Sequence, residues 1–502
     1  MYRNMSNQQI KQKSKKMALL TYSRFFLLSL SLFGLTGCSK FLDLPPRDKF
    51  PQQTLFSDEQ GFIDALTGVY LGMDRPNNGP SQGLYTNDLS IGMLSVMAYN
   101  YTNASTSAFS NGLYANTSRY SYTDAGVKAE IAGIWSGMYN NIANVNNLLL
   151  QIDNKKEIFT RDNYYRVKGE ALALRALFHF DLARLYGQPP VTGANEKSIP
   201  YITTFNITST PFVSLNTALD SCISDLKKAK LLLAQTDTAA VKKGSYDLFS
   251  SYSQNHMNYW ATQSLLARTY QYKGDFANAL ISAQAVIGSG KFPLITSNVA
   301  NIANTTRDRL FSQELVFALY STNVQKINSA LFEIQTGAFQ LPAANKTAIY
   351  TTTTGSTTDY RYISWFDNNN SGLNVPSKFF QNAGLPYLLQ NIMPVIRVSE
   401  MYYIAAECLG AKGDVPSGLS YLNKVRNARG LNSLTSTAIP DEANLSNEIM
   451  KEYKKEFIQE GQTFFYYKRL NKDLALVTGT TAIVPVGAYV FPIPDKEVEY
   501  NH

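Results

Sequence analysis

The chain has 502 residues, a hydrophobic fraction of 44% that is ordinary for a globular protein, and a formal net charge of +8. Its first 37 residues hold six Lys or Arg and no Asp or Glu, so the remaining body carries only +2. Because binding to phosphate backbones depends on clustered cations that release counterions, this near-neutral body argues against a nucleic-acid partner.

The N-terminus is predicted to be a lipoprotein signal peptide over residues 1–37. A basic, acid-free start precedes an apolar run over residues 25–35, which is too short to cross a bilayer. The run ends in Leu35-Thr36-Gly37-Cys38, the pattern at which bacterial lipoproteins are cleaved and acylated. We therefore expect Cys38 to carry the lipids that anchor the mature chain to a membrane. Whether translation starts instead at Met17 stays open.

Residues 38–502 are enough for a large core, and a chain of this size usually divides into lobes or extends as a solenoid. The two remaining cysteines, Cys222 and Cys408, lie within helical apolar patterns and are too few for a disulfide framework. We expect two buried thiols, with a bridge between them in an oxidising compartment as the alternative.

Helical periodicity dominates the body. Ser57-Asp58-Glu59-Gln60 has the spacing of a capping box and begins an apolar pattern that extends to about residue 73. Apolar stripes predict further helices over residues 127–152 and 162–186, the second ending before Gly187.

Two segments have the pattern of a tetratricopeptide helix hairpin, in which apolar stripes flank a Gly-Asp break. The breaks are Gly274-Asp275 and Gly413-Asp414, 139 residues apart, so insertions separate the units. The sequence therefore predicts a mostly α fold, a tetratricopeptide-repeat superhelical scaffold over about residues 55–73, 127–290 and 395–470.

Irregular, loop-rich insertions are predicted between the helical parts. Residues 74–124 and 343–385 are rich in Asn, Ser, Thr, Gly and Tyr and are expected on the surface. Because binding groups are often found on loops held by a rigid scaffold, these two insertions are the first candidates for a ligand site.

Five segments occur in an order that points to one family. They are Phe41-Leu42-Asp43 just after Cys38, residues 135–146, Gly169-Glu170-Ala171 running into Tyr186-Gly187, residues 397–407 continuing to 422–430, and Phe491-Pro492-Ile493-Pro494. Together they resemble motifs of the SusD/RagB family, the outer-membrane glycan-capture lipoproteins of Bacteroidetes. The resemblance covers nearly all of the mature chain.

The resemblance has departures near its late helix. Where the family usually has Glu-Arg at the start of that helix, this chain has Glu452-Tyr453. After Glu460-Gly461, the Arg and Asp that the family usually carries are Thr463 and Tyr466. If the two form an ion pair in the family, losing both avoids leaving one buried charge alone, so the scaffold can survive the exchange.

The resemblance implies a scaffold of about four tetratricopeptide units with a loop-rich part that carries the ligand site, and it implies no catalysis. It also implies a lid over a SusC-like TonB-dependent transporter barrel, which holds an oligosaccharide and releases it inward when the lid closes. We expect no cofactor. The identity of the glycan, binding of a peptide as in some relatives, and participation of calcium stay open.

A sugar site needs exposed aromatic faces for C–H edges, with amides and charged groups for hydroxyls. Trp365 in the second insertion is the leading predicted contact, with a ring folded back on the scaffold as the alternative, whereas Trp135 and Trp260 are predicted to be core. The predicted neighbours of Trp365 are Tyr360, Arg361 and Tyr362. A second predicted cluster, in the first insertion, consists of Asp88, Tyr99, Tyr101 and Asn103.

Patterns of enzymes are missing from the sequence. His179, His256 and His502 have no metal-ligand spacing, and neither His-Glu-x-x-His nor Gly-x-Ser-x-Gly occurs. His179 is expected to be a core histidine with satisfied hydrogen bonds. The glutamates of the late helix are interpreted as a solvated charged face rather than an acid/base pair; they are Glu452, Glu456 and Glu460.

Three alternatives to a glycan-binding lipoprotein stay open. A peptide- or glycoprotein-binding surface lipoprotein of the same family is the first. A helical-repeat scaffold that binds another protein is the second, because repeat architecture alone would permit it. A glycoside-cleaving enzyme is the third, and it would need two carboxylates facing each other across a cleft.

Overall fold

The computed structural model describes most of the chain after residue 51. The described residues are 52–74, 83–101, 112–236, 249, 251–296, 305–333, 339–341, 346, 349–350, 358–478 and 483–500. The predicted signal peptide, Cys38 and Asn103 lie outside them. The short helix α2 (Gln52–Leu55) belongs to a unit that ends at Ser57, and all other described elements belong to the unit that begins at Asp58.

The three predicted N-terminal helices are confirmed. Helix α3 (Glu59–Gly72) begins at the N-cap Asp58, whose carboxylate accepts a hydrogen bond from the backbone N–H of Gly61 at 2.9 Å. Helices α6 (Ala125–Ile152) and α7 (Asn163–Tyr186) follow the two predicted ranges closely. Their apolar stripes form buried faces, as the periodicity predicts.

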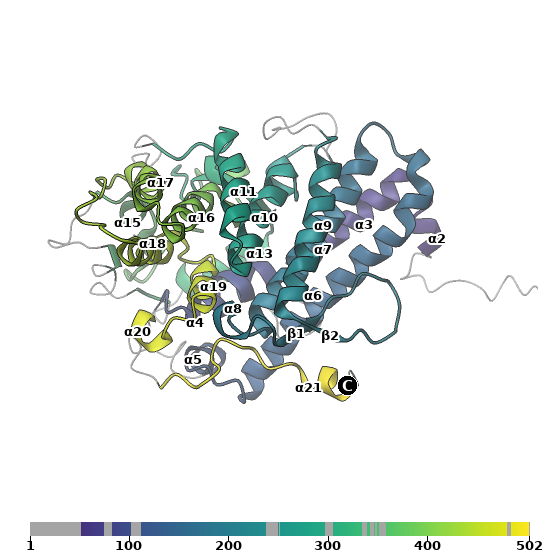
Figure 1. The fold of residues 1–502 in the computed structure, drawn as a ribbon, viewed down its shortest axis with the longest axis horizontal. Helices are drawn as coiled ribbons and strands as arrows, with labels where there is room; N and C mark the ends of the chain where they lie inside the picture. The colour runs from purple at the N-terminus through teal and green to yellow at the C-terminus, as the bar shows by residue number, and fades with distance from the viewer. Residues whose placement is uncertain are drawn as a thin grey trace, which may run out of the picture. The chain divides into compact units, whose positions relative to one another are not determined.

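The scaffold continues as a series of packed helices. It comprises α9 (Leu215–Leu233), α10 (Tyr259–Lys273), α11 (Phe276–Gly288), α16 (Val398–Ala411), α17 (Val415–Ala428) and α18 (Glu442–Glu456). From α6 onward each of these helices packs against the next, and Figure 1 shows α6, α7, α9, α10 and α11 side by side. The predicted fold class, a mostly α tetratricopeptide-like scaffold, is confirmed.

Both predicted tetratricopeptide hairpins have the same turn. Gly274 between α10 and α11 and Gly413 between α16 and α17 each have φ of +85°, in the left-handed region that favours glycine. The following aspartate caps the next helix in each case, because Asp275 accepts from Asn278 N and Asp414 accepts from Ser417 N. The Gly-Asp break is therefore a helix stop followed directly by a helix start.

The first insertion is not a surface loop where the structure describes it. Its described elements are the π-helix η2 (Leu84–Ile91), α4 (Met93–Met97) and α5 (Leu113–Ser118), and residues 84–98 are buried throughout. The surface prediction is therefore wrong for this part. Short polar side chains donate hydrogen bonds to nearby backbone carbonyls, as Ser90 does to Tyr85 O. A segment of polar composition can therefore be buried while its side chains keep hydrogen-bond partners.

Three two-stranded antiparallel sheets interrupt the helices. They pair β1 (Lys197–Pro200) with β2 (Phe212–Ser214), β3 (Leu315–Tyr320) with β6 (Ile392–Arg397), and β4 (Phe366–Asn368) with β5 (Asn374–Pro376). In the β3–β6 ribbon, Leu315 pairs with Arg397 at one end and Tyr320 pairs with Ile392 at the other. This ribbon lies in the long insertion between α11 and α16 and positions the clefts that are described below.

The remaining elements are short. The α-helical ones are α8 (Pro190–Gly193), α13 (Asn323–Asn328), α15 (Tyr360–Ser364), α19 (Gln462–Arg469), α20 (Leu474–Thr478) and α21 (Asp495–Tyr500). The others are η3 (Asp153–Ile158), η4 (Ser253–Asn255), η5 (Ser312–Glu314), η6 (Ser329–Glu333) and η7 (Tyr387–Leu389).

The core confirms several predictions about single residues. Cys222 and Cys408 are free and buried, and burial raises the pKa of the Cys408 thiol to about 12. His179 is buried, with Nδ1 at 2.9 Å from Arg175 O and Nε2 accepting from Ile202 N. Trp135 is buried as predicted, whereas Trp260 is only half-buried. Within the described ranges, no helix combines the length and the apolar character needed to cross a bilayer.

Candidate functional site

Trp365, the leading predicted ligand contact, is fully buried. Its indole Nε1 donates to Arg309 O at 2.6 Å, the Lys378 ammonium lies 3.7 Å from the ring centroid, and the Phe311 ring is 5.1 Å away. The structure thus shows the alternative arrangement, in which the ring folds back on the scaffold and offers no surface to a ligand.

Arg361 is also fully buried, in a network of ion pairs. Its guanidinium bonds to Asp359, to Glu452 at 2.7 Å and to Glu456 at 3.0 Å. Arg429 and Arg397 extend the network from other segments, and it also includes Glu314, Lys378, Arg426, Lys455 and Glu460.

The interpretation of the three late glutamates as one solvated helix face is therefore wrong, and Glu460 lies beyond the end of α18 at Glu456. Glu452, Glu456 and Glu460 are at most 4% exposed, because arginines from distant parts of the chain cover that face. Burial alone would raise the pKa of Glu452, but Arg361 and the neighbouring cations outweigh it and lower this pKa to about 2.

The two tyrosines predicted beside Trp365 are partly exposed to solvent. Tyr360 is half-buried, and its backbone N–H donates to Arg429 O at 2.9 Å. Tyr362 is half-buried, with the Lys346 ammonium 4.3 Å from its ring centroid. Both rings therefore lie at the edge of the buried ion network.

The second predicted cluster is mostly interior. Tyr101 is fully buried, donates to Ile91 O at 2.7 Å and packs on Phe332 and Phe339. Asp88 is fully buried as well, and Tyr99 is half-buried and donates to Ser118 O at 3.0 Å. The two predicted clusters pack on different aromatic groups, since Tyr362 packs on Tyr350 and Phe366.

The structure contains a large cleft that the sequence did not indicate. It has a volume of about 570 Å³, within the range typical of ligand pockets. We call it the α3 cleft, and it is lined by Gln60, Ile63, Asp64, Thr67, Tyr70, Leu71, Phe249, Asn255, His256, Leu319 and Tyr320.

The floor of the α3 cleft is a hydrogen-bonded triad. Tyr70 donates to Oε2 of the buried Glu170 at 2.6 Å, and Nδ1 of His256 lies 3.0 Å from the same oxygen. The backbone N–H of Met257 donates to the Tyr70 hydroxyl at 2.7 Å. Burial alone would raise the pKa of Glu170, but His256 and the hydrogen bond from Tyr70 outweigh it, so this pKa is lowered. The floor is therefore fixed before any ligand arrives.

The wall of the α3 cleft joins the end of α3 to the end of β3. Asp74, just after α3, accepts hydrogen bonds from Thr86 at 2.7 Å and from Ser321, which directly follows β3. The adjacent Tyr320 ring is 57% exposed, among the most exposed large side chains described. A strand that ends in an aromatic residue at Tyr320 is the one sequence signal that could have indicated this wall.

The chemistry of the α3 cleft suits a neutral polar ligand. Tyr70, Phe249 and Tyr320 supply ring surfaces, while Gln60 and Asp64 supply an amide and a carboxylate that bond to each other at 2.8 Å. Asp64 is the one carboxylate among its described lining residues. No group of three metal-ligating side chains occurs in the part of the chain that the structure describes.

Another cleft, of about 390 Å³, lies between α6 and residues 200–210. Trp135 lines it but is only 5% exposed, since its ring packs on Tyr139, Tyr186 and Phe212. The most exposed aromatic residue of its lining is Phe205, at 45%, whereas Tyr320 in the α3 cleft is 57% exposed.

Comparisons with known proteins show which family this chain resembles. The family profile described as "Starch-binding associating with outer membrane" matches residues 40–270, and the profile described as "SusD family" matches residues 235–483. A SusD-like protein of Formosa agariphila is 23% identical over 396 residues, which are 68% of this chain and 73% of that protein.

Solved structures show the same fold. A SusD-like carbohydrate binding protein from Bacteroides vulgatus superposes with a TM-score of 0.69 at 18% identity, over 88% of this chain and 96% of that one. A SusD superfamily protein from Bacteroides thetaiotaomicron has a TM-score of 0.68 at 17% identity, covering 89% and 97%. One from Bacteroides fragilis has a TM-score of 0.65 at 20% identity, covering 89% and 99%.

Proposed function

Because this chain belongs to the SusD family, we propose that it is a non-catalytic, lipid-anchored protein of the outer membrane that binds oligosaccharides. We propose further that it delivers them to a SusC-like TonB-dependent transporter. The single observation that carries this proposal is the match of two SusD-type profiles, which together span residues 40–483. The predicted lipidation of Cys38 supports the anchor.

We propose the α3 cleft as the oligosaccharide site. Its rings can pack on the C–H faces of a sugar, and its amide, hydroxyl and carboxylate groups can bond to sugar hydroxyls. Tyr320 is the proposed stacking residue, since its ring is exposed and its backbone is fixed by the β3–β6 ribbon. Aromatic rings lose little side-chain entropy when a ligand packs on them.

The lining of the α3 cleft favours binding over cleavage. A glycoside hydrolase of the usual kind needs two carboxylates on opposite sides of the scissile bond. Asp64 is the one acid among the described lining residues, and Glu170 behind the floor is fully buried and bonded to Tyr70 and His256. The contacts predicted at Tyr99, Tyr360 and Tyr362 stay predictions, as does Asn103.

Glycan-array binding followed by calorimetry tests the proposal. The chain from residue 39 onward should bind at least one polysaccharide class on the array without releasing products. Tyr320→Ala should weaken that binding about tenfold, which corresponds to about 1.4 kcal/mol. The control is Tyr421→Ala, because Tyr421 is a half-buried tyrosine on α17, away from the cleft lining, and this variant should bind like the wild type.

Other outcomes would replace the proposal with a named alternative. Binding of peptides with no binding of sugars would support the peptide-binding alternative, and product release would support a hydrolase. For delivery, the full-length chain should label with palmitate, lose the label in Cys38→Ala and co-purify from the outer membrane with a TonB-dependent barrel. Recovery of the unlabelled wild type from the cytosol would refute the anchor.

A further inference from the structure

A second cleft lies next to the α3 cleft. It has a volume of about 350 Å³, which is also within the range of ligand pockets. We call it the η7 cleft, and its lining includes Gln254, Lys291, Ser312, Leu315, Leu389 and Ile392. It combines amide, hydroxyl and ammonium groups with apolar surface.

The two clefts meet at a narrow ridge. Gln254 lines the η7 cleft, and the next residue, Asn255, lines the α3 cleft. Ile392 lines the η7 cleft, and its partner across the ribbon, Tyr320, lines the α3 cleft. Because directly paired residues of antiparallel strands have Cβ atoms about 4.5–5.5 Å apart, the ridge is about one side chain wide. A chain-like ligand in the α3 cleft can therefore extend over the ridge.

The η7 cleft has a buried acceptor without a donor. Oε1 of Gln254 is shielded from solvent and accepts no hydrogen bond from any group in the described residues. An unmet buried acceptor is destabilising by about 1–3 kcal/mol, so a turn of the Gln254 amide that brings Oε1 into the cleft toward a ligand donor would be favourable. A sugar hydroxyl is such a donor.

Three strained backbone positions surround the same cleft. Tyr252, Phe311 and Asn391 have φ of +53°, +52° and +60°, in the left-handed region that non-glycine residues rarely adopt. Each lies within two residues of a lining residue, namely Gln254, Ser312 and Ile392. Strain of this kind is typical of ligand sites.

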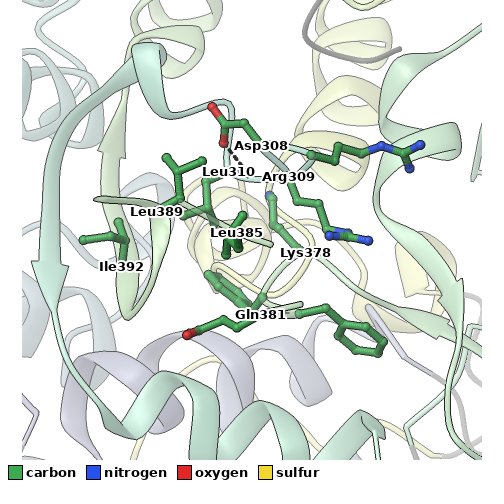
Figure 2. A pocket seen from close by; sticks show the side chains of 11 residues that line it. Asp308, Arg309, Leu310, Lys378, Gln381, Leu385, Leu389 and Ile392 are labelled. Atoms are coloured by element: carbon green, nitrogen blue, oxygen red, sulfur yellow. Dashed lines mark hydrogen bonds between the residues drawn. The ribbon is translucent and has the colours of Figure 1, made fainter. Parts of the chain in front are cut away.

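Aromatic surface borders the η7 cleft, and only a small cavity adjoins it. Tyr387, at the start of η7 and next to the lining residue Leu388, is 71% exposed. Leu310, Leu389 and Ile392 also line a smaller cavity of about 10 Å³, room for about one water. Figure 2 shows these three residues together with Lys378 and Leu385. This cavity is too small for a sugar unit, so a ligand in the η7 cleft would rest against the leucines rather than enter it.

We infer that the η7 cleft is a second carbohydrate subsite, which binds further units of the oligosaccharide held in the α3 cleft. The preferred ligand is then an oligosaccharide long enough to cross the ridge between Tyr320 and Ile392, rather than a disaccharide. This inference rests on the proposed function, because it assumes carbohydrate binding in the α3 cleft.

Calorimetry with oligosaccharides of increasing length tests the inference. The probes are size-fractionated malto-, xylo- and pectic oligosaccharides, from disaccharide to octasaccharide. In the series that binds, wild-type affinity should rise about tenfold or more once the ligand is long enough to cross the ridge, then level off. Tyr387→Ala and Gln254→Leu should flatten this rise, whereas Tyr320→Ala should lower the affinity at every length.

Gln254→Leu separates a binding role from a structural one. If the amide served only the fold, replacing its unmet acceptor with an apolar group would leave the length dependence intact and the unfolding midpoint equal or higher. Tyr421→Ala is the control and should behave as the wild type at every length. A length dependence that survives both Tyr387→Ala and Gln254→Leu, while Tyr320→Ala weakens binding, would refute the second subsite and leave the proposed function standing. Absence of binding to every series would refute both.

Discussion

The buried ion network gives the sharpest stability prediction, at Glu452. Its carboxylate accepts from Arg361 at 2.7 Å, from Arg426 at 3.1 Å and from Lys455 at 3.0 Å, and it is fully buried. Glu452→Gln keeps the shape of the side chain and removes the charge. The pKa of Glu452 is lowered from 4.5 to about 2, a difference that corresponds to about 3 kcal/mol of stability at neutral pH. Removing one partner of a buried ion pair typically destabilises the folded protein by about 3–5 kcal/mol, which agrees with the value from the pKa.

The same shift fixes the pH range of the effect. A carboxylate whose pKa is lower in the folded chain contributes its full stability above the unfolded pKa of 4.5, and this stability is lost as the pH falls toward about 2. The free energy of unfolding of the wild type should therefore exceed that of Glu452→Gln by about 3 kcal/mol at neutral pH. The difference should shrink steadily below pH 4.5.

Urea unfolding followed by circular dichroism measures this difference at neutral and acidic pH. The matched control is Glu448→Gln on the same helix, because Glu448 pairs with Lys451, which is 58% exposed. A surface pair of this kind contributes about 0–1 kcal/mol, so the control midpoint should barely move. If Glu452→Gln were no more destabilising than Glu448→Gln, or if its deficit were the same at acidic pH, the reasoning would be refuted.

Three further predictions concern single residues. Gly413→Ala and Gly274→Ala should each lower the free energy of unfolding by about 1–2 kcal/mol, because φ of +85° is a left-handed backbone conformation that is unfavourable for a residue with a Cβ. Thermal melts measure this loss. The control is Gly288→Ala, which should not destabilise the protein because φ is not positive there. Burial lowers the pKa of His179 to about 3, so NMR at pH 5 should show a neutral ring protonated at Nδ1, and an imidazolium there would contradict the structure. Cys222 and Cys408 should react with thiol reagents only after unfolding; rapid labelling of the native chain would contradict their burial.

The helical scaffold could be predicted from the sequence because its signals are local. The apolar stripe of α6 repeats within the helix itself, and the Gly-Asp turns at Gly274 and Gly413 need only adjacent residues. These elements are correct to within a few residues. The family motifs are also short and continuous in the chain, so the amino-acid sequence alone is enough to recognise the resemblance.

The buried ion network could not be predicted because its partners are far apart in the chain. Glu314, Arg361 and Arg429 are brought together only by the packing of α18 against the rest of the fold, and a charged helical stripe in isolation is indistinguishable from a solvated one. The composition around Trp365 predicts a loop, but the ring is buried because it contacts the Lys378 ammonium and donates to the Arg309 carbonyl. The α3 cleft could not be predicted for the same reason, since its walls come from residues 60–71 and 249–256 and from the end of β3.

The ion network and the clefts are connected through the β3–β6 ribbon. Glu314, directly before β3, is held by a bidentate pair with Arg429, and Arg397 at the end of β6 is held by Glu460. Since Leu315 pairs with Arg397, this end of the ribbon is fixed inside the network, while the opposite end carries Tyr320 and Ile392 to the two clefts. A stacking residue on a strand that is anchored at its base is better positioned than one on a free loop. The carbohydrate binding that we propose at Tyr320 should therefore weaken in variants that loosen the network, such as Glu452→Gln, by less than in Tyr320→Ala itself.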